Sequence, residues 1–408
     1  MKKLILAVLC LYLVACGTFN VKVDVVPSAT APVRTTLVMP TSVPATSTAT
    51  PTQTPTLTPI PTEVDPAITL TGIQMSDDLQ GWGVTSLGRI VKTANRGLFW
   101  HDITPPEGGF ERTGLFALTD NVAWAVPASF DQLNRIWRTI DGGNNWTLSG
   151  PVPVGEGVYT PLRLQFADEQ HGWLLVLAEN GEQDSHLTLY KTDDGGAAWM
   201  QITSITERME QDYLPAGTTM AFFDGQRGWI GGAWGPQDPT EWLMLKTDNG
   251  AESWGTDTFR LPKQKGIACD GNSIVDLPPS ALAVEVICTI PKDAKYLYHR
   301  LFYLSKKTGP EWHNWTLPGK LLSINFLNIN QGWMLVTSED PGLNKILYTL
   351  DGGDSWRTIN KVNWKNARFD FVTAKIGWAI VGVGSDTSLF HTEDGGKTWT
   401  QIRPFVSE

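Results

Sequence analysis

Tyr348-Thr-Leu-Asp-Gly-Gly-Asp-Ser-Trp356 is one of seven related nine-residue stretches in this 408-residue chain. Four copies are nearly identical, a fifth has Asn249 where those four have aspartate, and two are eroded. The copies end at Trp100, Trp146, Trp199, Trp254, Trp312, Trp356 and Trp399. These tryptophans are spaced by 46, 53, 55, 58, 44 and 43 residues. A repeat of this length indicates a chain built from seven similar units.

A second mark runs in phase with the first. In six units an apolar residue stands seven positions before a tryptophan, and in five of these glycine precedes the tryptophan. The pairs are Met75/Trp82, Ala117/Trp124, Phe166/Trp173, Phe222/Trp229, Phe326/Trp333 and Phe371/Trp378, and only the fifth unit lacks one. Because each tryptophan occupies the same place in its unit, we expect these residues to pack in the core rather than to stack on a ligand.

Each unit is expected to form four strands. In the third unit the runs LRLQFAD, GWLLVLA, HLTLYKT and AWMQIT alternate between apolar and polar residues, with turn residues between them. The Asp-Gly-Gly segment should turn between the last two strands, with the aspartate accepting N–H bonds of that turn. Seven such units predict an all-β fold, a seven-bladed β-propeller over residues 67–408. The first unit begins with its inner strand and the last ends with its outer strand, so we expect no shared closing blade.

The motif Ser/Thr-x-Asp-x-Gly-x-x-Trp resembles the Asp-box, or BNR repeat, of sialidases, sortilin-type receptors and photosystem II assembly factors. With its Gly-Trp mark and short, even units, the chain is most similar to the photosystem II stability/assembly-factor group. The resemblance implies that each motif is a structural turn. The residues concerned are Thr139, Asp141, Gly143, Trp146, Thr192, Asp194, Gly196, Trp199, Thr247, Asn249, Trp254, Thr349, Asp351, Gly353, Trp356, Thr392, Asp394, Gly396 and Trp399. One carboxylate per unit cannot supply the six to eight clustered oxygens that Ca²⁺ takes, so we expect no metal site and no cofactor.

Residues 1–15 have the pattern of a secretory signal peptide, with two lysines, an apolar run and a small residue before Cys16. Leu13-Val14-Ala15-Cys16 resembles the lipobox of bacterial lipoproteins. The resemblance implies cleavage before Cys16, lipidation of its sulfur, and an extracytoplasmic protein anchored to the cell membrane. The alternative is an ordinary signal peptide followed by a chance cysteine.

Residues 16–66 are expected to form a disordered tether. Between Pro27 and Pro66 the chain has nine proline, twelve threonine and three serine residues. Such a composition cannot bury a core, and repeated Thr-Pro favours extended segments. The tether would hold the propeller away from the membrane.

Charge and cysteine content limit the remaining possibilities. The formal net charge of −10 argues against a nucleic-acid partner, which would require a basic surface. Cys269 and Cys288 both fall in the fifth unit, and outside the cytoplasm they are candidates for a disulfide. Two free thiols are the alternative.

The loops that join second to third strands, and one unit to the next, should lie on the face opposite the Asp-box turns. They carry aromatic and acidic residues that no repeat position explains, as a protein or glycan interface would. The candidates are Trp234, Trp242, Asp238, Glu241, Tyr159 and Tyr213. Packing of these aromatic residues within the loops is the alternative.

These features favour a tethered, non-catalytic module that binds or assembles proteins. A glycan-binding propeller and a sialidase-like glycoside hydrolase are the alternatives. The Arg-Ile-Pro motif of sialidases is matched only by Arg89-Ile90-Val91, in which the proline is missing. We therefore name no catalytic residue.

Overall fold

The structure is a computed structural model in which twelve segments of the chain are described. They are residues 67–106, 109–128, 135–155, 158–179, 185–202, 219–231, 241–260, 268–277, 281–289, 297–305, 309–314 and 321–407. Two units, Met1–Ile60 and Pro61–Glu408, make up the chain, and all described residues belong to the second. The signal peptide and tether expected over residues 1–66 thus lie outside them. Within the described segments, no helix is long and apolar enough to cross a membrane.

The described strands form seven sheets. The first sheet contains β1 (Leu70–Met75), β2 (Gly81–Thr85), β3 (Ile90–Thr93), β4 (Phe99–Asp102) and the C-terminal β29 (Phe405–Ser407). The second contains β5 (Phe110–Ala117), β6 (Ala123–Pro127), β7 (Trp137–Thr139) and β8 (Thr147–Leu148), and the third β9 (Val158–Phe166), β10 (Gly172–Glu179), β11 (Ser185–Thr192) and β12 (Met200–Ile202). The fourth contains β13 (Thr219–Phe222), β14 (Gly228–Gly231), β15 (Glu241–Thr247) and β16 (Gly255–Arg260), and the fifth β17 (Ala268–Leu277), β18 (Ala281–Thr289), β19 (Leu297–Ser305) and β20 (Gly309–Asn314). The sixth contains β21 (Leu321–Phe326), β22 (Gly332–Thr337), β23 (Asn344–Thr349) and β24 (Arg357–Val362), and the seventh β25 (Ala367–Phe371), β26 (Gly377–Val383), β27 (Asp386–Thr392) and β28 (Thr400–Ile402).

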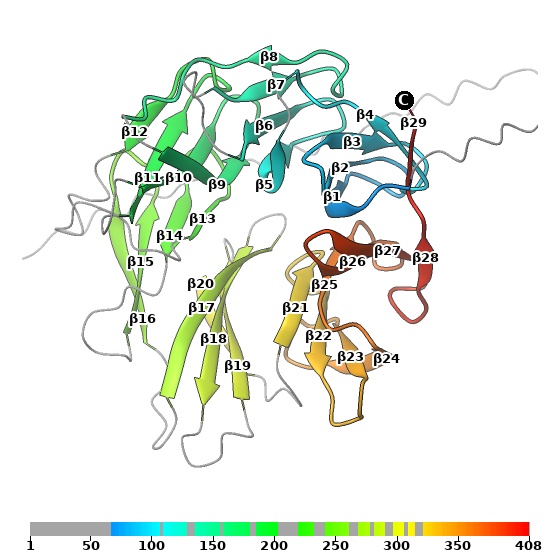
Figure 1. Ribbon diagram of the computed structural model, residues 1–408. Helices are drawn as coiled ribbons and strands as arrows, with labels where there is room; N and C mark the ends of the chain where they lie inside the picture. Colours follow the sequence, from blue (N-terminus) through cyan, green and yellow to red (C-terminus); the bar gives the residue numbers. More distant parts are fainter. Residues whose placement is uncertain are drawn as a thin grey trace, which may run out of the picture. The chain divides into compact units, whose positions relative to one another are not determined.

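The first strands of the sheets lie innermost. Each contacts the first strand of the next sheet in the order β1, β5, β9, β13, β17, β21 and β25, and β25 contacts β1 again. Figure 1 shows the sheets following one another around a common centre in this order. The predicted all-β fold of four-stranded antiparallel sheets is confirmed.

The expectation of no shared closing blade was wrong, because the first sheet contains strands from both ends of the repeat region. Strand β29 pairs in parallel with the outer strand β4, with Phe405 opposite Phe99, and Ala67 forms a bridge with Phe405. The Phe99 and Phe405 rings lie 6.2 Å apart. An outer strand offers unpaired N–H and C=O groups, and the last residues of the chain satisfy part of that edge. The two ends of the repeat region therefore meet at the first sheet.

The Gly-Trp mark forms the contact between neighbouring sheets. Trp333 of the sixth sheet stacks on Phe371 of the seventh, with ring centroids 3.6 Å apart and planes 3° from parallel. Trp399 meets this phenylalanine in a T-shaped contact, with ring centroids 5.9 Å apart. The glycine of the mark leaves room for the ring, since a Cβ at Gly377 would lie 2.3 Å from Cδ1 of Phe371. The expected core role is confirmed for nine repeat tryptophans, which are buried. They are Trp82, Trp100, Trp124, Trp173, Trp199, Trp229, Trp254, Trp333 and Trp378.

A buried threonine organises each Asp-box turn. The Thr349 hydroxyl donates to Asp351 Oδ1 at 2.8 Å and accepts from Gly353 N at 2.8 Å, while Ser355 N donates to the same carboxylate oxygen at 2.9 Å. The predicted acceptance of turn N–H groups by the aspartate is thus confirmed. Hydrogen bonds from Ser355, from its side chain first, lower the pKa of Asp351 to about 2. The carboxylate itself is exposed, whereas Thr349 is only 1% exposed.

Of the two eroded copies, the first keeps this geometry. The Thr93 hydroxyl donates to Asn95 Oδ1 and accepts from Gly97 N, both at 3.0 Å. In the other, β20 begins four residues after β19 ends, and Trp312 lies inside β20 opposite Phe302. Elsewhere the tryptophan of the turn precedes the last strand or, at Trp100, lies within it. The fifth unit therefore keeps the four strands with a shorter last turn.

Candidate functional site

The predicted interface residues do not form a site among the described side chains. Tyr159 is buried at 8% exposure in a core cluster with Leu164 and Tyr190, so the packing alternative holds for it. Glu241 and Trp242 begin strand β15, but their side chains lie outside the description. Tyr213, Trp234, Asp238 and the lipidation candidate Cys16 also lie outside the described residues.

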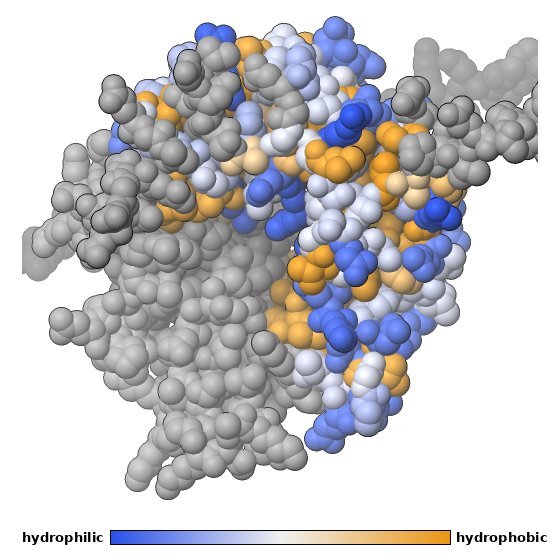
Figure 2. All heavy atoms as spheres, viewed as in Figure 1, coloured by the Kyte–Doolittle hydropathy of each residue, from blue (hydrophilic) through white to orange (hydrophobic). Residues whose placement is uncertain are grey.

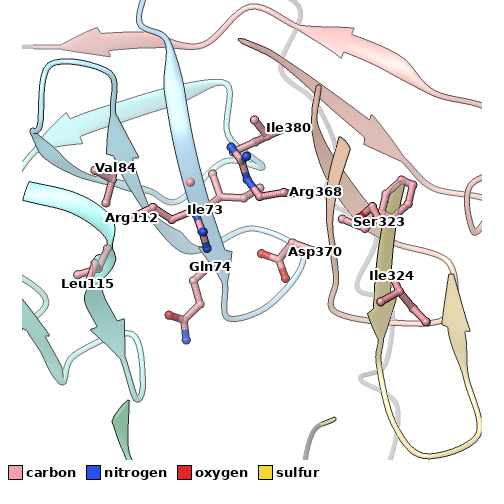
Figure 3. A pocket seen from close by; sticks show the side chains of 12 residues that line it. Ile73, Gln74, Val84, Arg112, Leu115, Ser323, Ile324, Arg368, Asp370 and Ile380 are labelled. Atoms are coloured by element: carbon pink, nitrogen blue, oxygen red, sulfur yellow. The ribbon is translucent and has the colours of Figure 1, made fainter. Parts of the chain in front are cut away.

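A cavity of about 350 Å³ lies between the first strands β1, β5, β21 and β25. Arg112 from β5, Arg368 and Asp370 from β25, and Gln74 from β1 contribute its polar groups. Figure 3 shows these side chains gathered around β1. Because four sheets contribute to it, the cavity exists only when the ring of sheets is assembled.

Local backbone features bring Arg112 into this cavity. The pairing of β5 with β6 is irregular between Phe110 and Leu115, so the strand bulges where Arg112 stands. A bulge redirects side chains relative to a regular strand. The stem of Arg112 then lies over Gly72 of β1, where an added Cβ would lie 2.3 Å from Arg112 Cγ. Glycine at position 72 therefore makes room for this arginine.

The cavity is cationic. Burial, and then repulsion from Arg112, lower the pKa of Arg368 and lower that of Arg163 on β9 to about 10. With a pKa of about 10, Arg163 still carries its charge at neutral pH. Arg368 donates to the carbonyl of Thr71, and its buried Nε has no hydrogen-bond partner. Among the described residues, neither Arg112 nor Arg368 forms an ion pair with a carboxylate.

Arg112 and Arg368 also line a second cavity of about 590 Å³. Its other walls come from the loop between β2 and β3, the start of β5 and the loop between β26 and β27. Leu87 on the first of these loops is 80% exposed, and Val383, next to the lining residue Gly384, is 69% exposed. Exposed apolar groups beside arginines resemble the composition of protein interfaces. On the face in view, Figure 2 shows hydrophobic and hydrophilic residues interspersed over the described sheets.

The sequence pattern did not predict a role for these arginines. Arg163 and Arg368 each stand three positions before the interface phenylalanine of their unit, and Arg112 stands five before Ala117. Alternate residues of an inner strand point away from the sheet interface. Polar residues at these positions were therefore the feature of the sequence that could have indicated a polar cavity. Arg89, the sialidase-like candidate, instead pairs with Asp102 at 2.5 Å and is absent from the lining of both cavities.

Cys269 and Cys288 lie directly opposite each other on β17 and β18. This register brings the two residues to neighbouring positions, as a cross-strand bridge requires. Their side chains lie outside the description, and the disulfide stays a prediction. Among the described residues no group of three or more His, Cys, Asp or Glu could hold a metal ion.

Asp-box turns on a ring of sheets, with a cationic cavity at the centre, define a repeat scaffold of the BNR type. Residues 304–404 match the family model described as photosynthesis system II assembly factor YCF48. This match confirms the resemblance to a BNR-repeat propeller close to the assembly-factor group. A search of curated proteins gave no match.

Several solved structures are similar to this chain. YCF48 bound to a D1 peptide is 13% identical, with 85% of this chain and 94% of that chain covered and a TM-score of 0.48. The GH74 xyloglucanase from Xanthomonas campestris is 11% identical over 84% of this chain and 54% of that chain, with a TM-score of 0.51. An oligogalacturonate lyase in complex with manganese is 11% identical over 80% and 90%, with a TM-score of 0.53. At these identities the likeness concerns the fold alone.

Proposed function

We propose that this chain is a seven-bladed β-propeller that acts as a non-catalytic protein-binding or assembly module. In this proposal Cys16 carries a lipid anchor outside the cytoplasm, and residues 16–66 tether the propeller to the membrane. The match of residues 304–404 to an assembly-factor family supports a protein partner. The closed contact order of seven first strands supports seven blades.

The cationic cavity carries the proposal. Arg112 and Arg368 present guanidinium groups without a carboxylate partner among the described residues, in a chain whose net charge is −10. Arginine binds carboxylates through paired hydrogen bonds, which are stronger where water is partly excluded. Leu87 and Val383 add exposed apolar surface near the mouth of the second cavity. A polypeptide segment with a carboxylate and apolar side chains fits this combination.

Site-specific photocrosslinking tests the proposal in the source cells. A photoreactive phenylalanine analogue at Leu87 should crosslink to a discrete protein, and Arg112→Gln with Arg368→Gln should abolish that product. The matched control is Arg357→Gln with Lys361→Gln, which removes two positive charges from exposed positions of β24. Equal crosslinking by the cavity variant, with melting curves like those of the wild type, would contradict the proposal.

The alternative is a propeller that binds or cleaves an anionic glycan. One observation favours it, since Asp370 lies in the same cavity as the arginines and burial raises the pKa of its carboxyl to about 7. A carboxyl group with such a pKa can serve as a general acid. Glycoside hydrolysis generally also requires a second, facing carboxylate. Turnover of a panel of chromogenic glycosides by wild type, and loss of that turnover in Asp370→Asn, would replace the binding proposal with this one.

The anchor has a separate test. Cys16→Ala should release the protein from the membrane fraction, while an inhibitor of lipoprotein signal peptidase should cause the uncleaved precursor to accumulate. Normal processing in the presence of the inhibitor would reject lipidation and leave the cavity proposal untouched.

A further inference from the structure

Glutamine side chains clamp neighbouring sheets together at two seams of the ring. Gln74 on β1 donates to the carbonyl of Ala117 on β5 at 2.6 Å and accepts from the N–H of the same residue at 3.2 Å. Gln165 on β9 holds Phe222 on β13 in the same way, at 3.0 and 3.1 Å. One amide can make both bonds because it carries a donor and an acceptor.

Asp370 occupies the corresponding position at the seam between the seventh and first sheets. It immediately precedes Phe371, as Gln165 precedes Phe166. Met75 N donates to Asp370 Oδ2 at 2.7 Å, which reproduces one of the two clamp bonds. Figure 3 shows the Asp370 side chain reaching from β25 towards β1. An ionised carboxylate has only acceptors, so the second bond, to the Met75 carbonyl, requires a proton on Asp370.

The surroundings of Asp370 favour that proton. Burial raises the pKa of its carboxyl to about 7, although the bond from Met75 N acts in the opposite direction. Arg368 on the same strand and Arg112 on β5 line the same cavity, and neither forms an ion pair with Asp370 in the described part of the chain. Strands β1, β21 and β26 contribute uncharged lining residues, namely Gln74, Ser323 and Ile380. Further along the seam, burial lowers the pKa of His391, which is therefore neutral near pH 7.

We infer that Asp370 is a proton-dependent latch. Its carboxylic acid accepts from the N–H of Met75 and donates to the Met75 carbonyl, and so closes the last seam of the ring. When the proton leaves, the seam keeps one clamp bond and gains a buried negative charge beside the cavity. Because Asp370 and β1 both line that cavity, loss of the latch loosens the wall of the cavity as well.

The sign of the pH effect follows from proton linkage. The folded chain binds the Asp370 proton up to about pH 7, whereas the unfolded carboxyl releases it near the ordinary aspartate pKa of 3.8. The folded state thus holds more protons between these two values, so its stability falls as the pH rises through this range. Above the folded pKa the contribution of this group no longer changes. The unfolding equilibrium constant should increase by up to about tenfold per pH unit between roughly pH 4 and 7.

Thermal unfolding of the full chain between pH 5 and pH 8.5 tests the latch, in the wild type and in Asp370→Asn. The asparagine amide can make both clamp bonds at every pH. We expect the wild-type midpoint to fall as the pH rises, and the variant to show a flatter profile and a higher midpoint at pH 8. A variant that keeps the wild-type slope would overturn the inference.

Two further variants separate the latch from other titrating groups. Gln165→Glu introduces an acid at the seam between the third and fourth sheets, and it should add a further decline in the midpoint as the pH rises above the ordinary pKa of glutamate. His391→Asn should leave the wild-type slope in place. Hydrogen exchange of a peptide spanning residues 70–75, corrected for intrinsic rates, reports on the seam directly. Its protection should be lost from pH 6 to pH 8 in the wild type and kept in Asp370→Asn, and an equal loss in both proteins would also reject the latch.

Discussion

Replacing Phe371 and Gly377 by alanine, singly and together, tests how neighbouring sheets fit. The Phe371 ring stacks on Trp333 and also contacts Trp399 and Phe369, with centroids 3.6, 5.9 and 6.1 Å away. Gly377 lies beneath the phenylalanine ring, and its Cβ would fall 2.3 Å from Cδ1. The second unit already carries alanine at both equivalent positions, Ala117 and Ala123. The chain itself therefore supplies the expected outcome of the double change.

The magnitudes follow from packing. Phe371→Ala should lower the free energy of unfolding by about 3–5 kcal/mol, since it creates a cavity and removes three ring contacts. Gly377→Ala should cost about 1–3 kcal/mol in the wild type through overpacking. In the Phe371→Ala background the ring is gone, and the same change should stabilise by about 0.5–1 kcal/mol, because alanine loses less backbone entropy than glycine. The coupling between the two sites is then about 1.5–4 kcal/mol.

Urea denaturation of the four proteins measures this coupling, provided that the slope of each transition stays constant. A control cycle pairs Phe371→Ala with an alanine at Gly342, an exposed loop position with nothing within 4 Å of its Cβ, and should show no coupling. If the changes at Phe371 and Gly377 were additive within about 0.5 kcal/mol, the explanation of the Gly-Trp mark would be refuted.

Three further predictions concern the turns, the closure and the cysteines. Thr349→Val removes a buried hydroxyl that bonds to three groups of the turn, and it should lower the free energy of unfolding by about 1–3 kcal/mol. Asp351→Asn should change this free energy by no more than about 0.5 kcal/mol, because Asn249 makes the equivalent bonds in its own turn. Equal melting curves for both variants would contradict this prediction. Removing residues 405–408 should lower the melting temperature and speed hydrogen exchange in β4, and unchanged exchange there would show that β29 is dispensable. Reduction should raise the intact mass by about 2 Da if Cys269 and Cys288 are bridged, and no change would leave them as free thiols.

The repeated part of the fold could be predicted from the sequence because neighbouring units pack against each other through equivalent residues. Trp333 and Phe371 lie in different sheets. Each nevertheless occupies the same position in its own unit as the corresponding residue in the other marked units. The turn could also be predicted, since Thr349 and Asp351 bond within a few residues of each other. The relative burial of these two side chains could not, because it depends on the neighbouring turn and sheet.

The cavity residues could not be predicted because they meet only when the ring is assembled. Arg112 and Arg368 are 256 positions apart and occupy different places in their units. The position of the Arg112 side chain depends on an irregularity in β5 and on the absence of a side chain at Gly72. Neither feature is part of the repeated sequence pattern. The pairing of β29 has the same origin, since Phe405 lies after the last unit and meets Phe99 only at the closure.

The seam between the seventh and first sheets departs from the repeat at Arg96. Arg96 stands where the matching turns have Gly195 and Gly395, and it adopts a positive φ of 68°, which disfavours side chains other than glycine. Trp378 still donates to the Arg96 carbonyl at 3.0 Å, as Trp333 does to Gly395 at 2.9 Å. The Arg96 side chain also pairs across the seam with Glu393 at 2.7 Å, which offsets part of the backbone strain.

A ring of repeats must close between units that are not consecutive in the chain, and here only residues 403 and 404 connect β28 of the seventh sheet to β29 in the first. The contacts across this seam include the β29 strand, the Arg96 ion pair and the bond from Met75 to Asp370, and each joins the two ends of the repeat region. Asp370 lies at the same time in the cavity that holds Arg112 and Arg368. A ligand that contacts these arginines would therefore stabilise the closing seam, because its binding energy is available only to the closed ring. Closure of the ring and binding of a ligand therefore depend on the same group of residues.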